Sequence, residues 1–227
     1  MCFTKEMSLG LFLVGCGTSL YLKSKNENIN LYIPIIYFSI MELLQYIGYI
    51  TLENKNKKFN KIIAVLIYVH IGFQPYFVNM WFSNFIPSSS KIYIPLILKL
   101  CIVFGLFWIS RLFFWDTSYK YLCDSNNEPA CGKKTEVLKG RIHLLYKAKI
   151  RASNYLTPSV FMHFFLWFVP VIFIGIDKFI YSITLLSGIF SWFLASNIHE
   201  TASIWCLWFI PVLLISLFYK KFKLNYL

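Results

Sequence analysis

Ionisable and amide side chains interrupt several long apolar stretches of this sequence. In order along the chain they are Glu42, Gln45, His70, Gln74, His163 and Glu200. An ionisable side chain that faces lipid costs about 3 kcal/mol or more, so such residues normally face the interior of a helix bundle and mark a ligand or proton pathway. The sequence therefore predicts an intramembrane polar site that binds or passes a small molecule, an ion or a proton.

The spacing of these residues places them on shared helix faces. Gln45, Tyr46 and Tyr49 follow Glu42 by three, four and seven residues, which is the spacing of one helical face. His70 and Gln74 are also one turn apart. A proline, Pro75, follows Gln74 directly; it should kink this helix and leave a free backbone carbonyl one turn earlier, beside His70.

A metal site is an alternative use of the same side chains. His70, His163 and His199 could supply three zinc ligands, with Glu42 or Glu200 as the base of an intramembrane hydrolase that acts on lipid. No spacing demands this arrangement, so we predict no cofactor and favour a non-enzymatic protein. Retinal is excluded because 201–219, the final apolar stretch, contains no lysine for a Schiff base. A third reading is a structural or membrane-remodelling protein in which the polar groups only join helices.

The composition indicates the elements that must position these side chains. Of the 227 residues, 58% are hydrophobic and only 14% are charged, against about 25% in a soluble domain. Seven apolar stretches approach the length of roughly 20 residues that a membrane-spanning helix needs. They are Ser8–Leu22, Leu31–Leu52, Ile62–Phe82, Ile92–Ser110, Pro158–Ile176, Phe179–Ala195 and Thr201–Phe218. We predict an all-α fold over residues 1–227, a single bundle of seven transmembrane helices, with six crossings and a re-entrant segment as the alternative.

One long polar loop, 116–157, separates the fourth and fifth stretches. Its segment Thr135–Ala152 has apolar residues interspersed with basic ones, which predicts an amphipathic helix on the membrane surface. Cys123 and Cys131 lie in the same loop. In the cytosol they should be reduced, whereas in an oxidising compartment they could bridge to each other or to Cys2. These cysteines could also form a zinc site with His143.

The basic residues predict the orientation of the bundle. Seven crossings place 13 of the 22 Lys and Arg residues on the face that holds the N-terminus and the long loop, and 7 on the opposite face. Basic loops normally face the cytoplasm, so the N-terminus is predicted to be cytoplasmic. The net charge of +12 is explained by contact with anionic lipids at this face, and no nucleic-acid partner is required.

Short motifs are spread over nearly the whole chain. They are Met1-Cys2 with Glu6 and Ser8-Leu9-Gly10, Met41-Glu42-Leu43-Leu44-Gln45, Gln74-Pro75, His143-Leu144, His163 with Phe165-Leu166-Trp167-Phe168, and Ser203-Ile204-Trp205-Cys206. In combination they resemble an uncharacterised multi-pass membrane protein family of large DNA viruses and protists. The resemblance implies a polytopic membrane protein and supplies no activity.

Two positions depart from the pattern of that family. It has Trp where this chain has Phe3, and it places the acid at the position of Gln45 and the amide at the position of Glu42. The resemblance thus implies that the polar face of this helix matters more than the position that carries the charge.

Overall fold

The computed structural model describes residues 4–113, 123–124, 128–152 and 159–226. Seven α-helices lie in these segments, which confirms the predicted all-α fold; a short 3-10 helix, η1, spans Ser88–Tyr93. The α-helices are α1 Lys5–Ser24, α2 Ile29–Glu53, α3 Lys57–Phe82, α4 Ile94–Phe113, α5 Val160–Phe173, α6 Lys178–Leu194 and α7 Thr201–Tyr226. Pro158, the predicted start of the fifth stretch, lies outside the described residues.

Four helical segments of the described chain are long and apolar enough to cross a membrane. They are Ile29–Glu53, Lys57–Phe82, Ser88–Phe113 and Thr201–Lys223. Helices α5 and α6 are apolar but have 14 and 17 residues, so α5 extends for about 21 Å, less than the roughly 30 Å of a hydrocarbon core. The membrane class is therefore supported, and the number of seven crossings stays a prediction.

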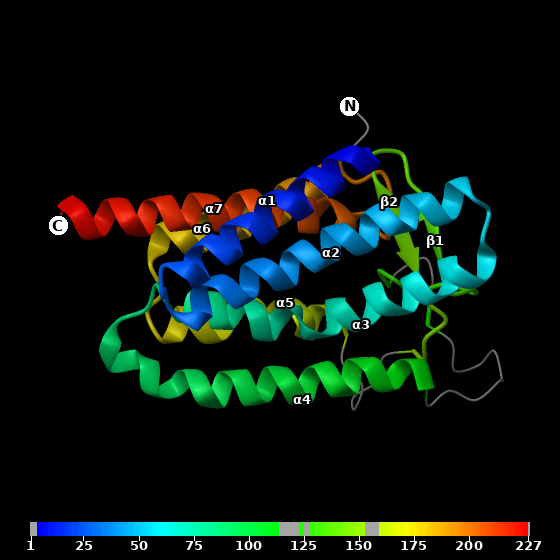
Figure 1. Ribbon diagram of the computed structural model, residues 1–227. Coiled ribbons are helices and arrows are strands. Elements are labelled where there is room, and N and C mark those ends of the chain that lie inside the picture. The colour runs from blue at the N-terminus through cyan, green and yellow to red at the C-terminus, as the bar shows by residue number, and fades with distance from the viewer. Residues whose placement is uncertain (1–3, 114–122, 125–127, 153–158, 227) are drawn as a thin grey trace.

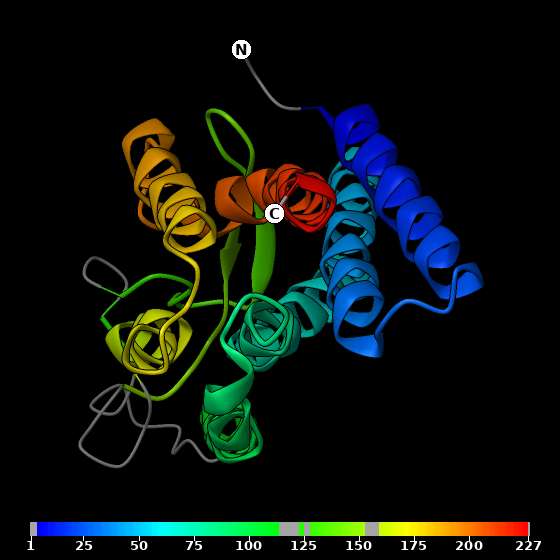
Figure 2. The same ribbon diagram turned by 90° about the vertical axis from the view of Figure 1, so that its left-hand side faces the viewer.

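The helices run side by side, with the N-terminus at one end of the bundle and the C-terminus at the other (Figure 1). Viewed along the bundle, α1 and α4 lie at its periphery (Figure 2). Helix α1 packs on α2, α4 packs on α3, and α7 contacts both α2 and α6. The buried core accordingly consists mainly of side chains from α2, α3, α5 and α7.

Prolines inside two helices leave backbone carbonyls that asparagines from other segments satisfy. Pro34 in α2 lacks the N–H that would bind the carbonyl of Asn30, and Asn84 Nδ2 donates to that carbonyl at 3.0 Å. Pro170 in α5 frees the carbonyl of Leu166 in the same way. Asn79 Nδ2 of α3 donates to this carbonyl at 2.8 Å. Both prolines are thus compatible with a buried helix.

The predicted surface helix within Thr135–Ala152 is wrong: this segment forms a β-hairpin. Strand β1 (Glu136–Lys139) pairs antiparallel with β2 (Leu144–Lys147). Val137, Leu144 and Tyr146 are buried while their neighbours are more exposed, which is the two-residue alternation of a strand. The apolar residues of this segment fit a helical period as well, but Gly140 breaks the helix, and the hairpin packs its buried face against α2, α3 and α7.

The hairpin lies at the same end of the bundle as the N-terminus, next to the turn between α2 and α3 (Figure 1). Asn60 of α3 fixes it from the side. Its Nδ2 donates to the carbonyl of Val137 at 3.1 Å, and its Oδ1 accepts from the Val137 N–H at 2.9 Å. The hairpin therefore caps one end of the helix bundle.

Candidate functional site

An aromatic cavity lies among α3, α5 and α7, near the end that the hairpin caps. Its volume is about 60 Å³, and four tryptophans line it: Trp108, Trp167, Trp192 and Trp205. Trp167 and Trp205 are in contact, with ring centroids 4.4 Å apart. Such a concave, mainly apolar space with few polar groups is typical of a site for a small molecule.

Two of the predicted site residues, Gln74 and His163, line this cavity. Gln74 Nε2 donates to Cys206 Sγ at 3.2 Å. His163 Nε2 accepts from Trp167 Nε1–H at 3.1 Å, because an indole N–H can only donate. In the neutral imidazole the proton is then on Nδ1, and this buried atom has no hydrogen-bond partner within the described residues. His163 thus offers the cavity an unused donor.

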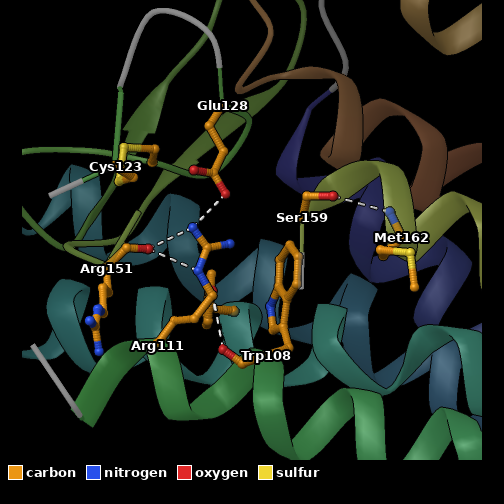
Figure 3. Close-up of polar contacts among 9 residues, drawn as sticks. Trp108, Arg111, Cys123, Glu128, Arg151, Ser159 and Met162 are labelled. Carbon is orange, nitrogen blue, oxygen red and sulfur yellow. Dashed lines mark hydrogen bonds and ion pairs between the residues drawn. A yellow bond between two sulfur atoms is a disulfide. The ribbon is translucent and has the colours of Figure 1, made fainter. Parts of the chain in front are cut away.

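A buried ion pair lies next to residues that line the cavity. Arg111 Nη2 lies 2.6 Å from Glu128 Oε1, and the Arg111 guanidinium also donates to the carbonyl of Arg151 from Nε at 2.9 Å and from Nη2 at 2.7 Å (Figure 3). Burial raises the pKa of Glu128, although the Arg111 charge opposes this shift. The next two residues, 129 and 130, line the cavity.

A disulfide between Cys123 and Cys131 closes the loop that carries Glu128 (Figure 3). The Cys123 N–H donates to the carbonyl of Ile150 at 3.2 Å, so the loop is attached to the segment that follows the hairpin. Cys131 forms a β-bridge with Ala148. The same loop therefore bears Glu128 of the ion pair and residues 129 and 130 of the cavity wall, and it is attached to the segment that follows the hairpin. Cys2 lies outside the described residues.

An apolar groove between α6 and the pair α5 and α7 adjoins the cavity. It shares four lining residues with the cavity: Phe164, Trp192, Thr201 and Trp205. Gly188 of α6 also lines it, and a Cβ at this position would lie 2.9 Å from the Trp205 ring. Glycine here permits the close approach of α6 and α7 beside the shared wall.

A second polar cluster lies beneath the hairpin and holds the predicted residue Gln45. Its Oε1 accepts a short hydrogen bond from His143 Nε2, and Nδ1 of the same imidazole accepts from Tyr49 Oη–H at 2.7 Å. Because the amide oxygen can only accept, these contacts define the neutral tautomer of His143. Burial lowers the pKa of His143 to about 4, while nearby Glu200 acts in the opposite direction.

Glu200 binds the turn of the hairpin. Its Oε1 accepts from the N–H groups of Ile142 and His143, both at 2.6 Å, and its Oε2 accepts from Ser196 Oγ at 2.7 Å. Burial favours the neutral acid, but these hydrogen bonds outweigh it and lower the pKa of Glu200. A Cβ at Gly140 would overlap the Glu200 carboxylate, so this turn requires glycine.

Glu42 is fully buried, and neither of its carboxyl oxygens has a hydrogen-bond partner within the described residues. The buried hydroxyls of Ser8 and Tyr146 are unpartnered on the same criterion. Burial raises the pKa of Tyr146 well above its usual value.

His70 belongs to a separate contact between α2 and α3. Its Nε2 donates to the carbonyl of Tyr37 at 2.8 Å, Tyr37 Oη donates in return to the carbonyl of His70, and the two rings stack with centroids 3.9 Å apart. Among the described residues, no group of three or more His, Cys, Asp or Glu side chains is placed to hold a metal ion. His199 lies beside β2, where its carbonyl accepts from the Tyr146 N–H at 3.4 Å.

The predicted site residues are thus divided among several places. Gln74 and His163 meet at the cavity, Gln45 and Glu200 meet at the hairpin, and His70 pairs with Tyr37. Sequence reasoning missed Arg111 as a buried residue, since a basic residue near the end of a span normally extends to the membrane surface. Its partner, Glu128, comes from the long loop, where no sequence pattern indicates the contact.

These features define the class of protein: an all-α membrane protein whose helix bundle is capped at one end by a β-hairpin and which contains an aromatic cavity that a disulfide-closed loop helps to line. The chain belongs to the DUF5765 family, a family of unknown function, whose sequence pattern matches residues 6–223. No curated protein and no solved structure matches the chain. The family membership agrees with the resemblance to an uncharacterised membrane family, and the distribution among viruses and protists stays a prediction.

Proposed function

We propose that this protein binds a small apolar molecule inside the membrane, in the cavity among α3, α5 and α7, and that it does so without catalysis. One observation carries the proposal. The cavity has an apolar, tryptophan-rich lining and a buried imidazole, His163, whose Nδ1–H has no partner in the described chain. A ligand oxygen that accepted this hydrogen bond would remove the cost of leaving a buried donor unpaired, which is about 1–3 kcal/mol.

The lining defines the ligand class. The small volume of the cavity fits one end of a lipid-like molecule whose apolar remainder lies in the adjoining groove, and a carbonyl, ester or hydroxyl oxygen at that end fits His163. Gln74 is a second polar contact within the same cavity. The groove between α6 and the pair α5 and α7 shares a wall with the cavity, which supports access from the bilayer rather than from water.

Tryptophan fluorescence tests this proposal directly. A dibrominated stearate methyl ester quenches tryptophans on contact, and Trp108 and Trp167 are each 2% exposed. Trp192 also lines the cavity but is 56% exposed, so Trp192→Phe serves as the background and removes the contribution of this exposed ring to the quenching. We expect saturable quenching in detergent and an affinity about fivefold lower in His163→Leu, which is the equivalent of one hydrogen bond of about 1 kcal/mol.

The matched control is His70→Leu, which removes a histidine outside the cavity and should leave the quenching affinity unchanged. Non-saturable quenching, or equal affinities of the native protein and His163→Leu, would contradict the proposed site.

We also propose that the hairpin end of the bundle faces the cytoplasm. The excess of 13 basic residues over 7 on the other face supports this orientation. The Cys123–Cys131 disulfide of the structure is the observation against this orientation, since disulfides rarely persist in the cytosol, so the state of these cysteines in the cell tests it.

A further inference from the structure

A lysine-rich groove lies outside the cavity, between the hairpin and the turn that joins α2 to α3. Its volume is about 650 Å³. Six lysines line it: Lys55, Lys57, Lys61, Lys133, Lys134 and Lys149. Within the described chain, Glu136 is the single acidic residue of the lining. The groove therefore carries a strong positive potential from two segments that are far apart in the sequence.

The acids around the groove do not neutralise it. Glu53, at the end of α2, forms an ion pair with Lys5 at 2.8 Å. Five of the six lysines are exposed, and Lys149 is partly buried. Like charges gathered at this density repel one another, so an anion that binds several of them at once gains from each.

The two walls of the groove are held at a fixed spacing. Asn60, which is 8% exposed and lines the groove, makes both hydrogen bonds to Val137 across it. Asn60 Nδ2 also donates to Thr51 Oγ1 at 3.0 Å. On the hairpin side, the Lys149 N–H donates to Thr135 Oγ1 at 2.9 Å. Hydrogen bonds therefore fix the backbone of both segments that bear the lysines.

The position of the groove indicates the source of the anion. Two candidate membrane spans, Ile29–Glu53 and Lys57–Phe82, end and begin beside it. Leu52, Val137 and Leu138 add apolar surface to its lining. A site at the end of two spans, part apolar and part cationic, is at the depth where the headgroups and upper acyl chains of lipids lie.

We propose that this groove binds the headgroup of an anionic lipid that carries more than one negative charge, such as a phosphorylated inositol lipid. The headgroup phosphates contact lysines of both walls, and the acyl chains extend along the apolar surface toward the bilayer. Lysine is a usual ligand of phosphate as a point charge, and several lysines can share one multiply charged group.

The test measures binding of short-chain phosphatidylinositol bisphosphate to the full chain in detergent, by native mass spectrometry and by the shift of its melting temperature. The groove variant is Lys61→Gln, Lys133→Gln and Lys134→Gln combined. Each lysine near the headgroup contributes about fivefold in affinity, so we expect this triple variant to bind the lipid about a hundredfold more weakly than the native protein. If that variant does not fold, Lys55→Gln with Lys57→Gln tests the opposite wall.

The matched control removes three lysines at the other end of the bundle: Lys91→Gln, Lys220→Gln and Lys221→Gln. We expect it to bind the lipid like the native protein. An equal loss in control and groove variants would overturn the proposal, because binding would then follow net charge alone. Unchanged binding in the groove variant would also overturn it.

A second arm separates the lipid from a soluble anion. Inositol trisphosphate, which carries the phosphates without acyl chains, should bind at least about tenfold more weakly than the lipid if the apolar lining contributes about 1.4 kcal/mol. Equal affinities would identify a soluble polyphosphate as the occupant and overturn the lipid assignment.

Discussion

Asn79 of α3 donates a hydrogen bond of 2.8 Å to the backbone carbonyl of Leu166 in α5. The carbonyl is available because Pro170, four residues later, has no N–H. Asn79 is fully buried and also donates to the carbonyl of Pro75 at 2.8 Å. One side chain therefore joins α3 to α5, two helices that line the cavity, at the carbonyl that Pro170 leaves free.

We expect Asn79→Leu to lower the free energy of unfolding by about 1–3 kcal/mol, because it leaves the buried carbonyl of Leu166 unsatisfied. In a Pro170→Ala background the helix can supply its own N–H to that carbonyl, so the same substitution should cost less. Unfolding in mixed detergent micelles measures both steps of this double-mutant cycle. Equal costs in the two backgrounds would show that Asn79 does not act through Leu166.

The helices were predictable from local sequence, whereas the hairpin was not. The spacing of Glu42, Gln45 and Tyr49 correctly placed them on one face, since that depends only on helical geometry. Around Val137 and Tyr146 the apolar residues fit both a helical and a strand period. The strand is stabilised by Asn60, 77 residues earlier, and Glu200, more than 50 residues later. No local pattern encodes partners at such separations.

The cavity, too, was predictable only in the part that local sequence indicates. His163 and Gln74 were identified because polar side chains are rare within apolar stretches. The buried tryptophans around them, Trp108, Trp167 and Trp205, could not be identified in this way. Aromatic residues are common in both environments, so their type alone does not separate a cavity wall from a membrane-facing surface.

His143 should make stability depend on pH. Its pKa in the folded protein is lowered to about 4 by burial, against about 6.5 in the unfolded chain. The unfolded state therefore binds the proton first, and the stabilisation that is present above 6.5 is lost as the pH falls toward 4. The loss is on the order of 3 kcal/mol.

Melting temperatures measured from about pH 7 to about pH 4 test this dependence. The decrease of melting temperature with falling pH should be smaller in His143→Gln than in the native protein. Glu200 provides the internal comparison: its pKa is lowered, so its contribution is lost only below the unfolded value near 4.5, at the acid end of the range. An unchanged slope in His143→Gln would contradict the assignment of the transition to His143.

The Arg111 and Glu128 pair should respond to single and double substitution differently. The side chain of Arg111 is fully buried and that of Glu128 is 13% exposed. Glu128→Leu removes the carboxylate that pairs with the buried guanidinium and should cost about 3–5 kcal/mol. The double variant Arg111→Met with Glu128→Leu removes both charges and should recover most of that loss. A double variant as unstable as the single one would argue against a mutual ion pair.

Glu42 should make the native protein less stable than a variant with an apolar side chain at this position. Its two buried oxygens lack partners in the described chain, and burying an unpaired polar group costs about 1–3 kcal/mol. Glu42→Met should therefore raise the melting temperature. Gln45→Met, one turn away, removes a side chain that is bonded to His143 and should lower it. A drop in both variants would show that Glu42 has a stabilising partner, and a rise in Glu42→Met would identify a residue retained for function at a cost in stability.

The orientation of the bundle can be read from Cys123 and Cys131, because the hairpin end that holds them is proposed to be cytoplasmic. A membrane-impermeant maleimide polymer, applied to intact cells, should label neither cysteine, and after permeabilisation without reductant it should label the partly exposed Cys123, whereas Cys131 is 1% exposed. In a Cys2→Ser, Cys16→Ser background the other described cysteines, Cys101 and Cys206, are buried, so added mass reports on this pair. Labelling that requires a reductant would show that the bond of the structure exists in the cell. It would place the hairpin in an oxidising compartment and reverse the orientation inferred from the lysines.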